Sequence, residues 1–247
     1  MPNQSVKKLD ESQLKNFDWE FVDEPKKAVI QQLIDTQIGR DDFRFIDIGG
    51  GNGKFADWVL SQYPKSTGVV LDNSSSLLKQ NIADERKRLV LGSATELQKY
   101  VEGKFDVVFM NFVLHHLVTN GYRKTRQLQV DVLKSASSVL ADAGRISILE
   151  NIYDGAIVRG LPSFLIFRLT SLRIIAPIIR KLGASTAGVG VCFLSRKQWL
   201  SSLDSASLKS INYIDHAAFR ISLLKRVVLH LGNIRGGHFW CSKAQIS

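Results

Sequence analysis

Cysteine is scarce in this chain, and long hydrophobic runs are absent from it. Only two of the 247 residues are cysteines, Cys192 and Cys241, and their wide separation matches no metal-binding spacing. No apolar stretch approaches the roughly 20 residues that a membrane-spanning helix needs. The polar start, MPNQSVKKLDESQ, lacks the apolar centre of a signal peptide. We therefore expect reduced thiols, no membrane span and a cytoplasmic location.

Acidic residues are few in the C-terminal part of the chain. Residues 155–247 hold 13 lysines and arginines but only two acids, Asp204 and Asp215, whereas residues 1–154 are nearly balanced. The net charge of +10 therefore belongs to the C-terminal part. This asymmetry indicates a partner that is an anionic substrate, a lipid headgroup surface or a nucleic acid.

Apolar runs that are typical of strands alternate with helical patterns through most of the chain. Strands are predicted at 43–49, 66–74, 87–94, 105–117 and 141–152, with two final strands at 208–219 and 236–244. The alternation indicates βαβ units, hence a parallel sheet with helices on both faces. In such sheets ligands bind beyond the carboxyl ends of the strands.

The first predicted strand ends in a cluster of glycines, within FIDIGGGNGKF at residues 45–55. A bare backbone turn before a helix exposes amide groups to a ligand, although a lone glycine pattern also fits a flexible loop. Asp47 inside the strand end is not part of the dinucleotide fingerprint, and no Gly-Lys-Ser/Thr follows, which disfavours a P-loop. An acid at this place can face a cationic ligand group.

Two later strand ends add to this pattern. Asp72 ends the second strand, 19 residues after Gly53, where a carboxylate can accept both hydroxyls of a ribose. The alternative is an acid before SSSLL, at the N-terminus of the helix that is predicted over SSLLKQNIADER. Gly92-Ser93-Ala94 ends the third strand and either leaves room for a flat base or forms a simple turn.

Together these residues resemble the class I S-adenosylmethionine-dependent methyltransferases of the small-molecule type. The resemblance covers residues 27–152 and is carried by DIGGGNG, LDNS, GSA, FDVVFMNFVLHHL and LADAGRISILEN. It implies one α/β domain, a doubly wound, mostly parallel seven-stranded Rossmann-like sheet with an antiparallel last strand and a helical lid. The expected parts are an N-terminal cap at 1–26, a cofactor-binding core at 27–152, a lid insertion at 153–200 and C-terminal strands and helix at 201–247.

The resemblance also implies the cofactor, S-adenosylmethionine, which leaves as S-adenosylhomocysteine. By that likeness the acid and glycines of the first loop bind the methionine portion, and the acid ending the second strand binds the ribose. Many members have an aspartate where Ser93 stands, so this chain departs from the pattern at the adenine. The residues expected to bind the cofactor are Asp47, Gly49, Gly51, Gly53, Asp72, Asn73, Ser93, Ala94 and Asn111.

The candidates for catalysis are His115, His116 and Glu150, which end the fourth and fifth strands. A histidine can take a proton from a hydroxyl or an amine near neutral pH. The alternatives are a histidine that caps or packs under the next helix and a glutamate that serves as an ion-pair partner. A metal site is disfavoured, because adjacent side chains rarely converge and no third ligand is evident.

The predicted activity is methyl transfer to oxygen or nitrogen of a hydrophobic small molecule, in natural-product (secondary) or quinone-like metabolism. The insertion at 155–200 is apolar with regular arginines, and a lid over an acceptor with an anionic group could use Arg168, Arg173 or Arg180. Two other interpretations are an amphipathic helix at 155–183 on an anionic membrane and a core-packing helix with solvated arginines. The segment 17–25, with Phe17, Trp19 and Phe21, is expected to close the same cleft or to pack ordinarily.

Two rival functions stay open. A nucleic-acid methyltransferase fits the net charge of +10, but residues 111–114 read Asn-Phe-Val-Leu rather than Asn/Asp-Pro-Pro-aromatic. The other rival is a member of the family that binds the cofactor without transferring its methyl group.

Overall fold

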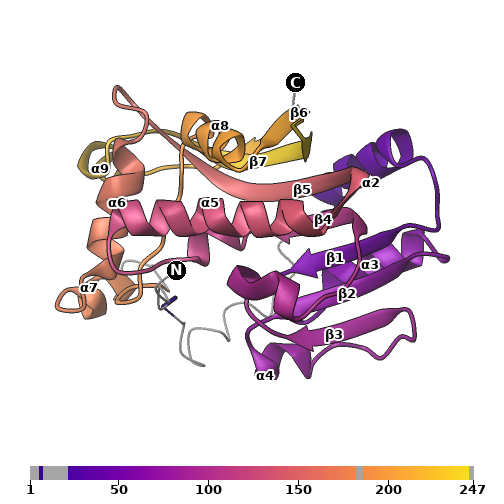
Figure 1. Ribbon diagram of the computed structural model, residues 1–247. Helices are drawn as coiled ribbons and strands as arrows, with labels where there is room; N and C mark the ends of the chain where they lie inside the picture. Colours follow the sequence, from indigo (N-terminus) through magenta and orange to yellow (C-terminus); the bar gives the residue numbers. More distant parts are fainter. Residues whose placement is uncertain (1–5, 8–21, 182–185, 245–247) are drawn as a thin grey trace.

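The computed structural model describes residues 6–7, 22–181 and 186–244, with only the backbone described at 178–180 (Figure 1). The expectations for Phe17, Trp19 and Phe21, and for the side chain of Arg180, lie outside the described residues.

A single twisted sheet of seven strands, in the order β3-β2-β1-β4-β5-β7-β6, forms the centre of the fold. Strands β1 to β5 pair in parallel, and β7 runs antiparallel to both β5 and β6. The predicted doubly wound sheet and its antiparallel last strand are therefore confirmed. The strands are β1 Arg44–Ile48, β2 Thr67–Asp72, β3 Lys87–Leu91, β4 Phe105–Asn111, β5 Leu140–Gly155, β6 Leu208–Ala218 and β7 Leu231–Lys243.

Helices cover both faces of this sheet (Figure 1). The helices are α2 Glu24–Gln37, α3 Lys54–Gln62, α4 Ser75–Leu78, η2 Ala94–Lys99, η3 Leu114–His116, α5 Tyr122–Val139, α6 Leu161–Ser171, α7 Ala176–Lys181, α8 Arg196–Ser205 and α9 Leu223–Val228. Because side chains alternate along a strand, β1 contributes to two cores. Ile46 and Ile48 pack with α5 and α8, while Phe45 packs with α2 and α3.

The helix predicted from the sequence SSLLKQNIADER is much shorter in the structure. Helix α4 ends at Leu78, and residues 79–86 are turns and irregular chain. The side-chain amide of Asn81 explains the stop, since it donates to the carbonyl of Leu78 at 3.1 Å and to that of Gly51 at 2.9 Å. A polar side chain that bonds the backbone of the last turn competes with continuing the helix. The same contact ties the segment to the glycine loop.

The insertion after β5 folds as α6, α7 and α8. Helix α6 packs against β5 and α5, and α8 begins with a capping box formed by Ser195 and Gln198. Phe193, between α7 and α8, stacks on Tyr153 of β5 with ring centroids 4.3 Å apart. Among the described helices, none is long and apolar enough to traverse a bilayer.

Candidate active site

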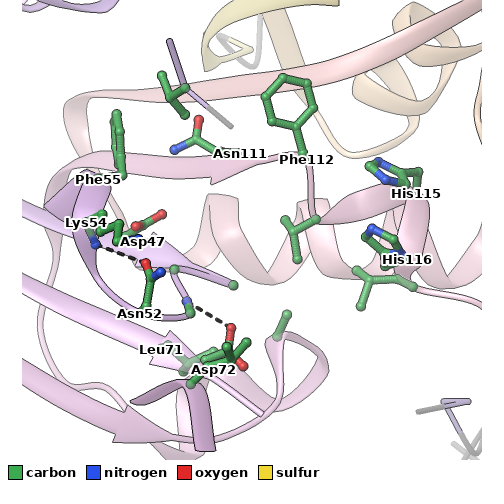
Figure 2. Close-up of a pocket in the computed structure, with 18 of the residues that line it drawn as sticks. Asp47, Asn52, Lys54, Phe55, Leu71, Asp72, Asn111, Phe112, His115 and His116 are labelled. Atoms are coloured by element: carbon green, nitrogen blue, oxygen red, sulfur yellow. Dashed lines mark hydrogen bonds between the residues drawn. The ribbon is translucent and has the colours of Figure 1, made fainter. Parts of the chain in front are cut away.

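A cavity of about 690 Å³ opens at the carboxyl ends of β1, β2 and β4, with the end of β6 on its far wall. Strand order reverses between β1 and β4, so this is the switch point at which parallel sheets bind ligands. The volume lies within the range of small-molecule sites. Figure 2 shows Asp47, Asp72, Asn111, His115 and His116 around this space.

The glycine loop forms one wall and depends on backbone conformations that other residues rarely adopt. Gly49 and Gly51 have φ of 75° and 51°, in the left-handed region. A Cβ at Gly49 would lie 2.4 Å from Cγ2 of Val113, so the loop passes close to the segment after β4. Helix α3 begins directly after the loop, and its N-terminal end faces the cavity.

Asp72, at the end of β2, is anchored by main-chain amides. Its Oδ2 accepts the amide of Gly51 at 3.0 Å, and its Oδ1 accepts the amide of Ser74 at 2.8 Å. Burial raises the pKa of this carboxyl above its usual value, and the amides of Ser74, Gly51 and Asn73 pull it back down. A carboxylate has further lone pairs, so Asp72 can still accept the two hydroxyls of a sugar.

Asn111 ends β4 and lines the cavity (Figure 2). Its amide nitrogen and oxygen are both buried, and neither has a hydrogen-bond partner among the described residues. Buried amides almost always bond to something, so these atoms indicate a polar ligand group. Asp47, 1% exposed, lines the same part of the cavity and supplies a negative charge for a cationic group.

The remaining predicted cofactor residues fall into two groups. Asn73, Ser93 and Ala94 line the cavity beside Asp72. The hydroxyl of Ser93 lies 2.9 Å from that of Thr95 and accepts its amide, so it caps η2. Gly53 does not line the cavity; with φ of 75° it is the N-cap residue of α3.

His115 and Glu150 form a buried pair at the wall of the cavity. Nδ1 of His115 lies 2.6 Å from Oε2 of Glu150, whose Oε1 accepts the amide of Leu114 at 2.8 Å. Glu150 is fully buried behind the histidine and does not itself line the cavity. Because the carboxylate accepts the hydrogen bond from Nδ1–H, Nε2 is the ring nitrogen left with a lone pair.

His116 lines the cavity next to His115, with ring centroids 4.1 Å apart. Burial and the neighbouring His115 lower the pKa of His116 well below its ordinary value. It is therefore neutral at physiological pH.

Sequence reasoning missed several cavity residues. Phe112 follows Asn111 with a φ of 53°, which is rare for an aromatic residue, and it lines the cavity (Figure 2). Lys7, Lys26 and His216 also line it. Only His216, in IDHAAF near the end of a predicted strand, carried a signal that could have been noticed.

No described residue of the insertion at 153–200 lines the cavity. Arg168 and Arg173 are exposed and lie outside it. The insertion instead supports the histidines from behind: Phe193 stacks on His115 at 4.6 Å, and the amide of Cys192 donates to the carbonyl of His115. A lid role for 153–200 stays a prediction.

Residues 46–146 match the family model described as "Methyltransferase domain". No curated protein sequence matches the chain. The solved structures that share its fold include the following three. CalO1, a methyltransferase in calicheamicin biosynthesis in its SAH-bound form, is 16% identical, with a TM-score of 0.51 over 89% of this chain and 55% of that one. The mitomycin 7-O-methyltransferase MmcR is 16% identical, with a TM-score of 0.55 over 94% of this chain and 60% of that one.

The third is the 1,6-didemethyltoxoflavin-N1-methyltransferase of Burkholderia thailandensis, with bound 1,6-didemethyltoxoflavin and S-adenosylhomocysteine. It is 15% identical, with a TM-score of 0.54 over 95% of this chain and 85% of that one. The chain thus spans little more than half the length of CalO1 and MmcR. At these identities the likeness concerns the fold, and the match over 46–146 concerns the sequence of the core.

Proposed function

We propose that this chain is a class I methyltransferase that methylates an oxygen or nitrogen of a hydrophobic small molecule, on the basis of its fold and of its core sequence. S-adenosylmethionine is the methyl donor. MmcR is named a 7-O-methyltransferase and the Burkholderia thailandensis enzyme an N1-methyltransferase, which supports an acceptor atom that is oxygen or nitrogen. We place the enzyme in the cytoplasm, in keeping with two described cysteines that are both free and buried.

The cavity fits the cofactor on two observations. The unpartnered amide of Asn111 requires a polar group, and the buried Asp47 beside it suits the ammonium of an amino acid. Asp72 then holds the ribose, and Asn73, Ser93 and Ala94 lie where the adenine would be. When bound, S-adenosylmethionine supplies an electrophilic methyl group on a sulfonium, and the chain supplies alignment and a dry site.

The pair of His115 and Glu150 is the observation that carries the proposed chemistry. Glu150 keeps the Nδ1 proton in place, so Nε2 of His115 can take the proton that a phenol or amine must lose. The developing imidazolium is stabilised by the buried carboxylate 2.6 Å away. His116, neutral because of its burial, is the second histidine beside the acceptor.

The residues that line the cavity near the histidines indicate the polarity of the acceptor. Phe112, Val113, Leu117 and Phe219 make this wall apolar, which favours a hydrophobic ring or chain. Lys7 lines the same cavity, and both the burial of its amine and the nearby Arg173 lower its pKa. An anionic substituent on the acceptor would relieve that repulsion. Lys7 therefore takes the part that Arg168, Arg173 and Arg180 were expected to play.

The test is label transfer by the full chain. Incubation with methyl-labelled S-adenosylmethionine and a panel of phenols, carboxylated phenols and aromatic amines should label one class of product. The Glu150→Gln variant, which keeps the shape of the site, should label far less of the same product. Labelling of RNA that is suppressed when moderate salt is added to the reaction would instead establish a nucleic-acid methyltransferase. Tight cofactor binding with no labelled product in any extract would establish a member that does not transfer methyl groups.

A further inference from the structure

Helix α9 turns its apolar face away from the protein. Leu223, Leu224, Val227 and Val228 occupy one side of this six-residue helix and are 77, 74, 71 and 59% exposed. No residue of α9 is buried. The sequence shows a helical apolar spacing here, which normally indicates a core-facing surface. A solvent-exposed apolar face indicates a surface that binds a partner.

A second exposed apolar segment lies beside α9. The turn after β5 presents Ile157 and Val158, which are 85 and 57% exposed. The backbone amides of both donate to Nε2 of His230, just after α9, each at 3.0 Å. These bonds hold the turn next to the end of α9, and Figure 1 shows α9 and the start of α6 at the same end of the molecule.

Exposed cations surround these apolar side chains. We call the whole surface the α9 patch, and its residues are Ile157, Val158, Arg159, Phe219, Arg220, Leu223, Leu224, Lys225, Arg226, Val227 and Val228. The patch contains no acid, and none of its four cations forms an ion pair with another described residue. Lys225 and Arg226 lie on the face of α9 opposite its leucines and valines.

We propose that the α9 patch docks on an anionic phospholipid surface. Large aliphatic side chains set among unpaired cations are the composition that binds acidic bilayers, because the apolar atoms enter the acyl boundary and the cations meet the headgroups. A second copy of the chain fits less well, since a twofold contact would bring together two basic patches that contain no acid. This docking does not depend on the proposed methyl transfer.

The patch reaches the rim of the cavity. Phe219 is 55% exposed and also lines the cavity, and its amide donates to the carbonyl of Ile234. When the protein is docked through the α9 patch, the cavity would therefore lie near the lipid surface. A route for a hydrophobic acceptor from lipid to cavity rests on the proposed function, whereas the docking itself does not.

Vesicle co-sedimentation of the full chain tests the proposal. The chain should pellet with vesicles of phosphatidylcholine containing phosphatidylglycerol, and about tenfold less with phosphatidylcholine alone. The Leu223→Ser/Leu224→Ser variant should lose about tenfold in partitioning on acidic vesicles, because its apolar anchor is gone. In the Lys225→Glu/Arg226→Glu variant, partitioning onto acidic vesicles should fall at least tenfold. The binding that remains should no longer depend on salt.

The matched control is Lys79→Glu/Ile82→Ser, which removes an exposed cation and an isoleucine 72% exposed after α4, away from the patch. It should bind as the unaltered chain does, and melting curves should show that all variants fold. Equal binding to both kinds of vesicle, or a loss in the control as large as in the α9 variants, would overturn the proposal. So would a concentration-dependent dimer without vesicle binding, which would assign the patch to a second copy.

Discussion

Nδ1 of His115 lies 2.6 Å from Oε2 of Glu150, while Oε1 of the same carboxylate accepts the backbone amide of Leu114. One buried acid therefore orients both the imidazole and the turn that carries it. His115 lies on η3, just after β4, and Glu150 lies within β5, the neighbour of β4 in the sheet. This geometry is that of a base held by an orienting carboxylate, which is the basis of the first prediction.

Replacing Glu150 with glutamine should lower kcat on the acceptor found by label transfer about 10²- to 10⁴-fold. The amide keeps an oxygen for the Leu114 amide but can offer its NH₂ to Nδ1, which favours the wrong tautomer of His115. Cofactor affinity measured by calorimetry should hardly change. His115→Ala should lower kcat by a similar amount.

The control for this pair is Glu96→Gln on the exposed turn of η2, where the acid contacts Lys99 at the surface. It should leave turnover as it is. Full turnover in Glu150→Gln with a normal melting curve would show that His115 needs no orienting acid, and the base assignment would fail.

Asp72→Ala should weaken cofactor binding by about 1–3 kcal/mol, the range for losing hydrogen bonds to a charged group. The variant also releases the amide of Gly51, which Asp72 holds at 3.0 Å. Isothermal titration with S-adenosylhomocysteine measures the change, and the exposed Asp204→Ala serves as control. An unchanged dissociation constant would remove Asp72 from the cofactor site.

Gly51→Val should abolish measurable cofactor binding, whereas Gly51→Asn should retain part of it. The reason is conformational: a Cβ at Gly51 meets only ordinary contacts, with Leu77 at 3.6 Å, but φ of 51° strongly disfavours a β-branched residue. Asparagine tolerates this region.

Gly103→Val provides the comparison, because Gly103 has φ of 77° in a turn that does not line the cavity. It should lower the melting temperature while leaving cofactor affinity intact. Equal affinity of the valine and asparagine variants at position 51 would contradict the role of the loop conformation.

The stability of the fold should decline below neutral pH because of His238. Burial lowers the pKa of this histidine from 6.5 to about 3, and its Nε2 lies 2.8 Å from the hydroxyl of Ser147. Between these two pKa values the unfolded chain binds a proton at His238 and the folded chain does not. The free energy of unfolding therefore falls as the pH falls. The loss from pH 7.5 to pH 5 should be about 2 kcal/mol from this group.

Urea unfolding at several pH values measures that slope. His238→Gln, which can still bond to Ser147, should flatten it without removing it, because the pKa of the buried His116 is lowered in the same direction. Parallel slopes for the variant and the unaltered chain would show that His238 is not the group responsible.

Much of the fold was predictable because its signals are local. The run ending at Gly49 became β1, and Asp72 ended β2 as expected, since a buried parallel strand needs an apolar run and its end needs a polar or small residue. The helix after β2 was overestimated because Asn81 bonds back to Leu78 and Gly51, and that contact exists only once the loop has folded.

The candidate site was predictable in its residue types but not in its pairings. His115 and His116 are equivalent in the sequence, and only the position of Glu150 distinguishes them. The apolar spacing of Leu223, Leu224, Val227 and Val228 predicts a helix that packs inward, yet the structure leaves that face in solvent. Periodicity shows that a helix is amphipathic and does not say what covers its apolar side.

The sequence by itself determined the order of strands and helices, the glycine turn after the first strand and the positive charge of the C-terminal part. These depend on neighbouring residues and on composition. The tertiary structure alone decided which histidine meets the buried carboxylate, which side chains wall the acceptor end and which apolar face stays outside. Those outcomes depend on how segments distant along the chain pack, and short stretches of sequence carry no record of that packing.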